Sequence, residues 1–225
     1  MIRVSTKFDR PDTAFVERLA GYSSATIHEA QGRLGALDSS IKPVDRRMSL
    51  CGPAFTVQCA PRDNLMLQTA IEYARPGDVI VVSAGEYSEA GSFGDVLANA
   101  CRAKGLGGLV TDTGVRDTED LRALGFPVFS YSVCIKGTVK ETVGPMCQPV
   151  SIGGQLVRPG DVIRGDADGV VVVRREDAGA VAVASRERVD AEAGYIAAYR
   201  AGKSVAEICG LESLLVAKGL VIDGE

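Results

Sequence analysis

Strand-like and helix-like segments alternate regularly between residues 51 and 133, and this alternation limits the possible folds more than any other feature. Apolar, strand-sized runs, from CGPAFTVQCA to PVFSYSV, are separated by segments with helical spacing, namely NLMLQTAIEYA, GDVLANACRAKG and TEDLRALG. A helix that joins two strands of one sheet must pack back on that sheet. The alternation therefore predicts an α/β domain with a sheet at its centre.

The segments on either side of this alternation predict further layers. Residues 11–35 read as two helices, of which the second begins with capping serines and ends at Gly35, and both are expected to pack on a sheet. Residues 138–174 change to strand-and-turn spacing without a helical period, which predicts antiparallel strands in a second layer. From about residue 176 to residue 225 the chain is predicted to form a helical extension.

The hexapeptide RPGDVI occurs at residues 75–80 and again at residues 158–163. Such a repeat can report an internal duplication of the chain. Two similar turns that each lead into a buried strand explain the repeat about as well.

Length and composition favour one soluble globular domain over residues 1–225. Of the 225 residues, 46% are hydrophobic and 24% are charged. The net charge is −4 and the basic residues are scattered, so nucleic acid is not an expected partner. The apolar runs are too short to span a membrane and no apolar signal segment begins the chain, which predicts a cytoplasmic protein without membrane association. The 6 cysteines lie far apart without a C-x-x-C motif, so we expect buried thiols rather than zinc ligands or disulfides.

The feature that bears chemistry is the spacing D-x20-R-D, formed by Asp95, Arg116 and Asp117. Asp95 opens one predicted helix, while Arg116 and Asp117 close the next predicted strand, so packing of the helix on the strand can bring them together. Taken singly, Asp95 fits a first-turn acid at a helix N-terminus, and Asp117 fits a cap for the helix TEDLRALG. Together they predict a small anion site with a metal beside it.

Backbone groups complete this predicted anion site. The amides of Gly94, Asp95, Val96 and Leu97 lie at the start of a helix, where N–H groups bind anions. Arg116 lies at a strand-to-helix turn, where α/β proteins place ligands, and its guanidinium can grip a carboxylate or an enolate with two hydrogen bonds. We therefore expect these groups to converge on one small anion.

Glu192 is another acid in an unusual position. It lies at helical spacing from Val189, Tyr195, Ile196 and Tyr199, which places a carboxylate on the apolar stripe of its own helix. A lone acid in such a stripe usually extends to the rim, because burying an unpaired charge costs several kcal/mol. The alternative is a cation or polar partner supplied by another element or another subunit.

A series of segments, in order along nearly the whole chain, carries a family resemblance: SATIHEAQGRLG, CGPAFTV, RPGDVIVV, FGDVLA, TDTGVRD, FPVFS, KGTVKETVG and PGDVIRGDADGVVVV. They resemble the RraA-like superfamily, and within it the class II pyruvate aldolases that act on 4-hydroxy-4-methyl-2-oxoglutarate and 4-carboxy-4-hydroxy-2-oxoadipate. The resemblance implies a single α/β domain of the layered β/β/α kind, the swivelling or phosphohistidine-like fold.

The same resemblance implies roles for individual residues. Asp117 matches the acid that ligates a divalent metal, usually Mg²⁺ with Mn²⁺ or Co²⁺ as alternatives, and Arg116 matches the arginine that grips the pyruvyl group and steadies the enolate. Asp95 matches the acid that positions this arginine and ordered water, with the following two amides near the pyruvate carboxylate. Glu192 matches a glutamate that a neighbouring subunit adds to the water shell of the metal, which implies a homotrimer or homohexamer.

The residue chemistry agrees with the implied activity, cleavage of a 4-hydroxy-2-oxo acid to pyruvate and a second oxo acid. Breaking the C3–C4 bond leaves pyruvate enolate, whose charge needs a Lewis acid or an imine. Decarboxylation of oxaloacetate gives the same enolate and is expected to accompany the aldolase. An imine would need Lys136 or Lys140, although an exposed strand lysine is usually solvated. Lys140 can instead contact the distal carboxylate of a dicarboxylic substrate.

Two residues and one further function stay open. His28, the only histidine, is more often structural than a base on such a helix face, and Arg33 can contact a substrate carboxylate if its helix lines the cleft. RraA-like proteins also include regulators that bind and inhibit a ribonuclease by protein-protein contact, and such a protein needs no metal acid. The presence of Asp95, Arg116 and Asp117 favours the enzyme. No G-x-G-x-x-G follows a strand, so a methyltransferase is not supported.

Overall fold

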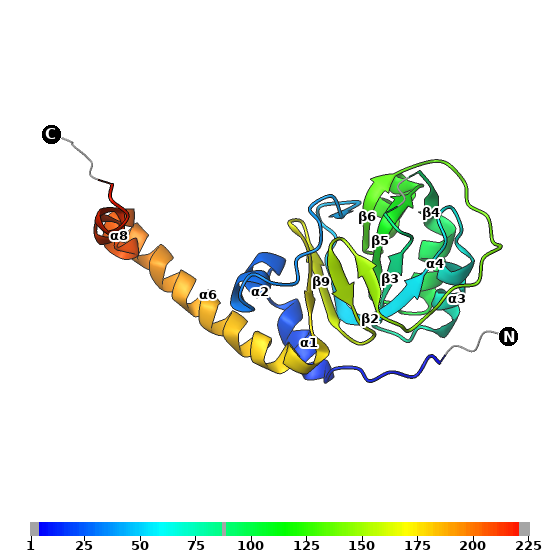
Figure 1. Ribbon diagram of the computed structural model, residues 1–225, viewed down its shortest axis with the longest axis horizontal. Helices are drawn as coiled ribbons and strands as arrows, with labels where there is room; N and C mark the ends of the chain where they lie inside the picture. Colours follow the sequence, from blue (N-terminus) through cyan, green and yellow to red (C-terminus); the bar gives the residue numbers. More distant parts are fainter. Residues whose placement is uncertain (1–4, 87–88, 221–225) are drawn as a thin grey trace.

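An eight-stranded sheet forms the centre of the computed structural model, which describes residues 5–86 and 89–220 (Figure 1). Its strands follow the order β1-β6-β5-β3-β2-β9-β10, and β4 pairs with β5 beside this path. The pairings β2–β3, β3–β5 and β5–β6 are parallel, and helices connect these strands along the chain, which confirms the predicted α/β alternation. The elements are β2 (Leu50–Gln58), α3 (Leu65–Tyr73), β3 (Val79–Ser83), β4 (Gly91–Phe93), α4 (Asp95–Ala103), β5 (Gly108–Val115), α5 (Thr118–Leu124) and β6 (Val128–Val133).

The two N-terminal helices begin where a side chain satisfies free backbone amides. Asp12 caps α1 (Thr13–Ala20) and Ser23 caps α2 (Ser24–Ala30), each by accepting a hydrogen bond from an amide of the first turn. α2 ends before the predicted Gly35, because the chain adopts left-handed conformations soon after the helix.

β2 is shared by two halves of the sheet. Its first residues, Leu50–Pro53, pair antiparallel with β9 (Val162–Asp166), whereas the rest of the strand pairs with β3. β9 in turn pairs antiparallel with β10 (Gly169–Val173). The sheet curls so far at this switch that its halves face each other: the ring of Phe129 in β6 packs so closely on Gly165 in β9 that an added Cβ would lie 2.9 Å from it.

The resulting layers are helix, strand, strand and helix (Figure 1). α3, α4 and α5 cover the parallel half, a second apolar cluster fills the space between the two halves, and α1, α2 and α6 (Ala178–Arg200) cover β9 and β10. The predicted α/β fold with an antiparallel second layer is confirmed. The outer helical layer agrees with the expectation that the two helices of residues 11–35 pack on a sheet, and it forms because Val171 and Val173 leave an apolar face on β10. The remaining elements are β1 (Lys42–Pro43), the hairpin β7 (Val150–Ile152) and β8 (Gln155–Val157), and the short 3-10 helix η1 (Arg175–Asp177).

The two copies of RPGDVI form the same turn. In each copy a buried aspartate accepts a hydrogen bond from the amide of the arginine three residues earlier. Asp78 also pairs with Arg10 at 2.7 Å, and Asp161 pairs with Arg174 at 2.6 Å. The first turn leads into parallel β3 and the second into antiparallel β9, so a shared turn accounts for the repeat.

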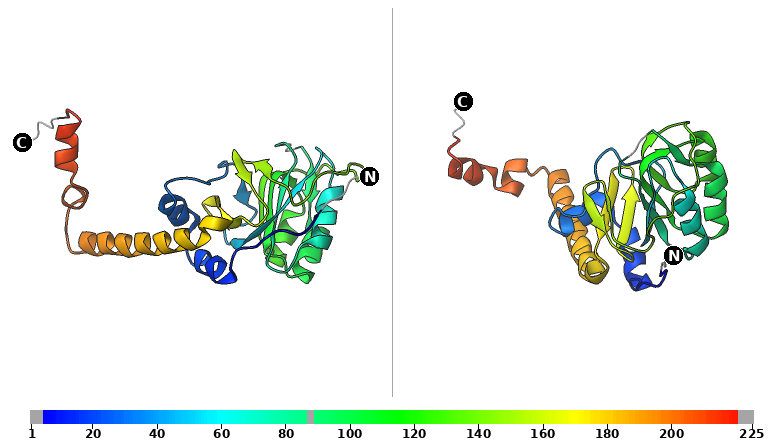
Figure 2. Two further views of the ribbon diagram at one scale, coloured as in Figure 1. Left: turned by 60° about the horizontal axis from the view of Figure 1, so that its bottom comes forward. Right: turned by 45° about the vertical axis from the view of Figure 1, so that its right-hand side comes forward.

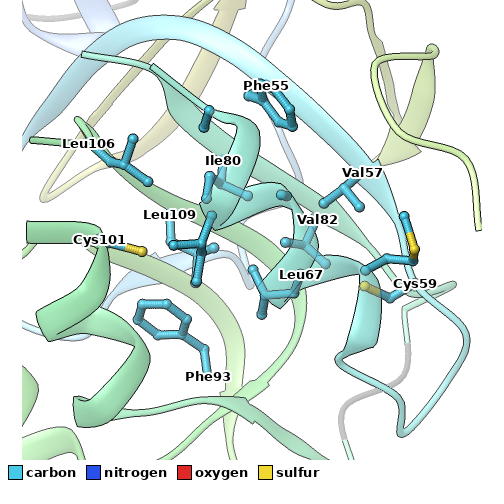
Figure 3. Packing of buried hydrophobic residues seen from close by; sticks show 14 of the residues in the cluster. Phe55, Val57, Cys59, Leu67, Ile80, Val82, Phe93, Cys101, Leu106 and Leu109 are labelled. Carbon is cyan, nitrogen blue, oxygen red and sulfur yellow. The ribbon is translucent and has the colours of Figure 1, made fainter. Parts of the chain in front are cut away.

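Some of the cysteines are buried and others are not. Cys59, Cys101 and Cys147 are buried, and Figure 3 shows the first two within the apolar cluster under α3 and α4. Burial raises the pKa of Cys59 and of Cys101 to about 12, so both thiols stay neutral near pH 7. Cys209 is exposed, contrary to the expectation of buried thiols, because it lies in a C-terminal helix beyond the sheet.

The C-terminal helices extend away from the sheet (Figures 1 and 2). The buried residues of α6 all lie between positions 178 and 185, and the rest of this helix projects from the body with α7 (Val205–Cys209) and α8 (Leu211–Ala217) at its far end. Across residues 5–86 and 89–220, no helix has the length and apolar character needed to cross a membrane. Large apolar side chains stay exposed on the projecting part: Val189, Tyr195, Ile196, Tyr199, Val205, Leu214 and Val216.

Candidate functional site

A cavity of about 360 Å³ lies where β4 and β5 end and where α4 and α5 begin. This is the edge at which open parallel sheets bind ligands, because strand ends and helix N-termini meet there. Every residue predicted for the anion site lines the cavity: Gly94, Asp95, Val96, Leu97, Arg116 and Asp117.

Arg116 follows β5 directly and is fixed beside β4. Its amide donates to the carbonyl oxygen of Phe93 at 2.9 Å. Its aliphatic stem passes over Gly91, where an added Cβ would meet the Cβ and Cδ atoms of Arg116 at 3.2 and 3.3 Å. The side chain is 47% exposed, so its guanidinium can exchange water for an incoming carboxylate in a two-point contact.

Asp117 adopts a left-handed backbone conformation, with φ 55° and ψ 42°. Such a conformation is uncommon for a residue other than glycine and is concentrated at functional sites. Asp117 occupies the N-cap position of α5, yet its side chain makes no capping hydrogen bond, contrary to the capping role considered from the sequence. The carboxylate instead lies toward the cavity, where its Oδ2 atom is 3.4 Å from the amide nitrogen of Asp95 and 3.4 Å from Nε of Arg116.

Gly94 is required for this arrangement because the space beside it is filled. An added Cβ would lie 2.2 Å from Oδ2 of Asp117 and 3.2 Å from Cγ of Arg116. The backbone of Gly94 is extended, so the constraint is space and not conformation. The absence of a side chain lets the carboxylate of Asp117 approach the start of α4.

Asp95 begins α4 and lines the cavity, but its carboxylate does not pair with Arg116. Within residues 5–86 and 89–220, the ion pair of Arg116 is with Asp117. The following amides, of Val96 and Leu97, belong to the first turn of α4, where backbone N–H groups have no intrahelical acceptor. The role of Asp95 in positioning Arg116 therefore stays a prediction.

Two further lining residues were not singled out from the sequence. Asn64 and Gln68 lie one turn apart at the start of α3, and both line the cavity. The Nδ2 atom of Asn64 donates to the carbonyl oxygen of Ser92 at 2.9 Å, and its Oδ1 atom accepts from Nε2 of Gln68 at 3.0 Å. Two amide side chains at i and i+4 share one face of a helix, and this spacing was the signal that could have identified them.

Lys140 lines the cavity, together with Gly137 and Thr138 of the same segment. It is exposed, whereas an imine-forming lysine is usually desolvated. Lys136 does not line the cavity and pairs with Glu89. The position of Lys140 thus agrees better with binding an anionic ligand than with forming an imine.

A hydrated divalent cation fits the donors of this cavity. Carboxylate and amide oxygens from Asp117, Asp95 and Gln68 are the hard ligands that Mg²⁺ prefers. The part of the chain that the structure describes contains no group of three or more His, Cys, Asp or Glu side chains that could enclose a metal. An ion here would therefore keep most of its waters, as Mg²⁺ does when one or two carboxylates hold it.

Three other residues considered from the sequence do not reach this cavity within one chain. Glu192 lies on the projecting part of α6, where its Oε1 atom pairs with Nε of Arg188 at 3.0 Å. His28 and Arg33 line a separate cavity of about 600 Å³ between α2 and α6. The cation beside Glu192 thus comes from its own helix, and its contribution to a neighbouring subunit stays a prediction.

Comparison with known proteins places the chain in a family. A family described as "RraA-like: Aldolase/RraA" matches residues 24–172, a segment that contains the whole D-x20-R-D spacing. A protein of Halalkalibacterium halodurans named "Putative 4-hydroxy-4-methyl-2-oxoglutarate aldolase" is 36% identical over 180 residues, which cover 80% of this chain and 86% of that protein.

Solved structures agree with this match. The crystal structure of Streptomyces coelicolor RraAS2, described as an unusual member of the RNase ES inhibitor RraA protein family, is 30% identical with a TM-score of 0.71, and the match covers 84% of this chain and 98% of that one. An uncharacterized protein from Pseudomonas syringae pv. tomato shares the fold at 24% identity with a TM-score of 0.77, over 89% of this chain and 98% of that one. The chain therefore belongs to the RraA-like family of aldolases and RraA proteins.

Proposed function

We propose that this protein is a divalent-metal-dependent aldolase that cleaves a 4-hydroxy-2-oxo acid to pyruvate and a second oxo acid. The observation that carries the proposal is the convergence of Asp95, Arg116 and Asp117 on one cavity at the N-terminus of α4. The H. halodurans relative supports the same reaction class through its name. The proposed substrates are 4-hydroxy-4-methyl-2-oxoglutarate and 4-carboxy-4-hydroxy-2-oxoadipate, and oxaloacetate decarboxylation is proposed as an accompanying activity.

In this proposal the chain binds the pyruvyl half of the substrate at two places. The amides of Val96 and Leu97 receive the C1 carboxylate, because helix N-termini favour anions. The guanidinium of Arg116 contacts the 2-oxo oxygen and strengthens its hydrogen bonds as negative charge develops there. The carboxylate of Asp117 would hold the divalent cation. A bound divalent cation supplies Lewis-acid stabilisation of that charge.

The bond changes then follow from these positions. The proton of the C4 hydroxyl passes to a water molecule held by Asp95, and the C3–C4 bond breaks as C4 becomes a carbonyl carbon. The electron pair of that bond goes to the pyruvyl fragment as an enolate, which takes a proton from water at C3 to give pyruvate. In oxaloacetate the departing group is carbon dioxide, and the same residues stabilise the same enolate.

Lys140 is proposed to contact the distal carboxylate of a dicarboxylic substrate. It lines the same cavity as Arg116 and forms no ion pair with an acid among the residues that the structure describes. A substrate with carboxylates at both ends would place one charge at the start of α4 and the other near this lysine.

A second copy of the chain is proposed to complete the site in a homotrimer or homohexamer. Apolar side chains are exposed near the cavity, with Val96 72% and Ile135 88% exposed, and others are exposed on the projecting part of α6. A second copy that covers these surfaces would remove them from water. Glu192 of one copy would then reach the cavity of the next and hold water around its cation.

The test of the activity is release of pyruvate from a 4-hydroxy-2-oxo acid and from oxaloacetate, with Mg²⁺ and then with excess EDTA. We expect turnover that Mg²⁺ restores and EDTA abolishes. Turnover that resists EDTA and is trapped by borohydride would replace the metal mechanism with an imine. A complete absence of turnover would favour a regulator that binds a ribonuclease, the activity in the name of the S. coelicolor relative.

The shared site has its own test. Arg116→Ala and Glu192→Ala impair different parts of the proposed site, so mixed oligomers of the two variants should be more active than either variant alone. If the mixtures are no more active than the separate variants while the protein is oligomeric, Glu192 does not act on a neighbouring copy.

A further inference from the structure

A segment without helix or strand lines one part of the cavity. We call residues 136–142 the strap; Gly137, Thr138 and Lys140 of the strap line the cavity. Its first residue is anchored by the amide of Gly91, which donates to the carbonyl oxygen of Lys136 at 2.8 Å. Most of the strap is exposed, so apolar burial contributes little to its position.

The middle of the strap is held by the residues that precede α3. The amide of Val139 donates to the carbonyl oxygen of Arg62 at 2.9 Å, and the amide of Asn64 donates to the carbonyl oxygen of Val139 at 3.1 Å. These two hydrogen bonds form a bridge between Asp63 and Val139. Lys140 thus directly follows a residue, Val139, whose backbone is held by two hydrogen bonds.

Asp63 adds a second hold through its side chain. The residue is 3% exposed, and its Oδ2 atom accepts hydrogen bonds from the amides of Glu141 at 2.9 Å and Thr142 at 2.7 Å. Its Oδ1 atom accepts from the amide of Leu65 at 2.9 Å, in the first turn of α3. One carboxylate therefore ties the two residues that follow Lys140 to the start of the helix that carries Gln68.

The protonation state of Asp63 agrees with this role. Burial by itself would raise the pKa of the carboxyl group, but the hydrogen bonds from the three amides outweigh burial and hold the pKa below its usual range. The group is thus charged at neutral pH, and hydrogen bonds to a charged acceptor are about twice as strong as neutral ones.

We propose that Asp63 is a positioning residue that fixes the strap at the cavity, so that Lys140 is held where it can select substrates with a second carboxylate. The proposal rests on the proposed function for its substrate. The structural part of the proposal does not depend on the proposed function: Asp63 acts through the backbone amides of the two residues that follow Lys140, and its carboxylate is engaged by amides rather than facing the ligand.

The first experiment measures hydrogen exchange of the Glu141 and Thr142 amides in the wild type and in Asp63→Asn. The amide side chain keeps the shape of the carboxylate but places a donor group where an acceptor is needed. We expect exchange of both amides to accelerate at least tenfold, while the amides of β5 keep their protection. Unchanged exchange at both positions would overturn the proposal, whether or not the protein is an aldolase.

Asp166→Asn is the matched control. Asp166 also has a partly buried carboxylate, with its side chain 18% exposed, that accepts from two amides, those of Ser24 and Asp168, but it lies on the other half of the sheet. Asp166→Asn should alter stability without changing exchange in the strap. If Asp63→Asn does not fold, Asp63→Glu takes its place, because it keeps the charge and moves the carboxylate by one methylene.

The second experiment compares substrates in steady-state kinetics. For a dicarboxylic 4-hydroxy-2-oxo acid, Asp63→Asn and Lys140→Met should each raise KM about tenfold with kcat within about twofold, because only binding shared by ground and transition states is lost. The inhibition constant of pyruvate, which has one carboxylate, should not change.

The double variant separates this role from a general structural effect. If Asp63 acts through Lys140, the two effects on KM should be strongly non-additive, so that the double variant resembles Lys140→Met alone. Additive effects, or an equal loss of pyruvate affinity, would overturn the proposal. If the wild type has no turnover at all, the proposed function fails, and the exchange experiment still decides the role of Asp63.

Discussion

The substitution Gly94→Ala tests the site with one added carbon. The new Cβ would start 2.2 Å from Oδ2 of Asp117, and ordinary contact begins at 3.4 Å. The carboxylate must therefore move by about 1.2 Å, a displacement of the size that costs on the order of 100-fold in rate, or about 2.7 kcal/mol of transition-state stabilisation. Because the side chain of Asp117 is 32% exposed, it can move toward solvent without unfolding the chain.

The assay is kcat/KM for pyruvate release, together with Mg²⁺ affinity by calorimetry and Tm by circular dichroism. We expect kcat/KM and Mg²⁺ affinity to fall while Tm stays within a few degrees, since the extended backbone of Gly94 accepts alanine. Gly137→Ala is the matched control, because Gly137 lines the same cavity and an added Cβ there meets no atom within 4 Å. Wild-type kcat/KM and Mg²⁺ affinity in Gly94→Ala would refute the placement of the Asp117 carboxylate, and equal losses in both variants would refute the steric argument.

Four further outcomes follow from the geometry and from the buried thiols. Asp117→Ala should abolish the stimulation by Mg²⁺, and stimulation that survives in this variant would show that another residue holds the cation. Arg116→Ala should lower kcat/KM by an amount equivalent to about 3 kcal/mol or more of transition-state stabilisation, as the loss of an oxyanion donor does. A change in kcat/KM below tenfold would contradict the contact of Arg116 with the 2-oxo oxygen. Glu192→Ala should weaken Mg²⁺-dependent turnover with unchanged Tm, and wild-type rates would remove this residue from the site. The thiols of Cys59 and Cys101 have folded-state pKa values of about 12, above the ordinary value of 9.0, so the unfolded chain loses these protons first. The free energy of unfolding in urea should therefore fall as pH rises above about 9, and Cys101→Ala should reduce that slope.

Much of the fold was predictable because its signals are local. The apolar runs and helical spacings between residues 51 and 133 correspond to elements of the structure, and Ser23 caps α2 as its residue type predicts. The short strands β1 and β4 were not predicted, since two or three residues carry no periodicity. The curl of the sheet was not predictable either, because it depends on contact between Phe129 and Gly165, which are distant in sequence.

The candidate site was likewise predictable only in part. Asp95, Arg116 and Asp117 could be proposed together because a single helix and strand separate them. The left-handed backbone of Asp117 and the role of Asp63 could not, since the first is a conformation and the second joins residues 78 and 79 positions apart. Glu192 stays a prediction because one chain alone does not bring it to the cavity.

The division of β2 between two sets of partners has a consequence for how this protein unfolds. Leu50–Pro53 hydrogen-bond to the half of the molecule that holds the N-terminal helices, and the remaining residues of the same strand hydrogen-bond to the half that holds the cavity. Removing β2 from either half would leave the backbone groups of the other half without their hydrogen-bond partners. We therefore expect that no division of the chain yields two fragments that fold independently. We expect the body of the protein to unfold in a single cooperative transition. A substitution that destabilises β9 or β10 should therefore also destabilise the half that holds the cavity.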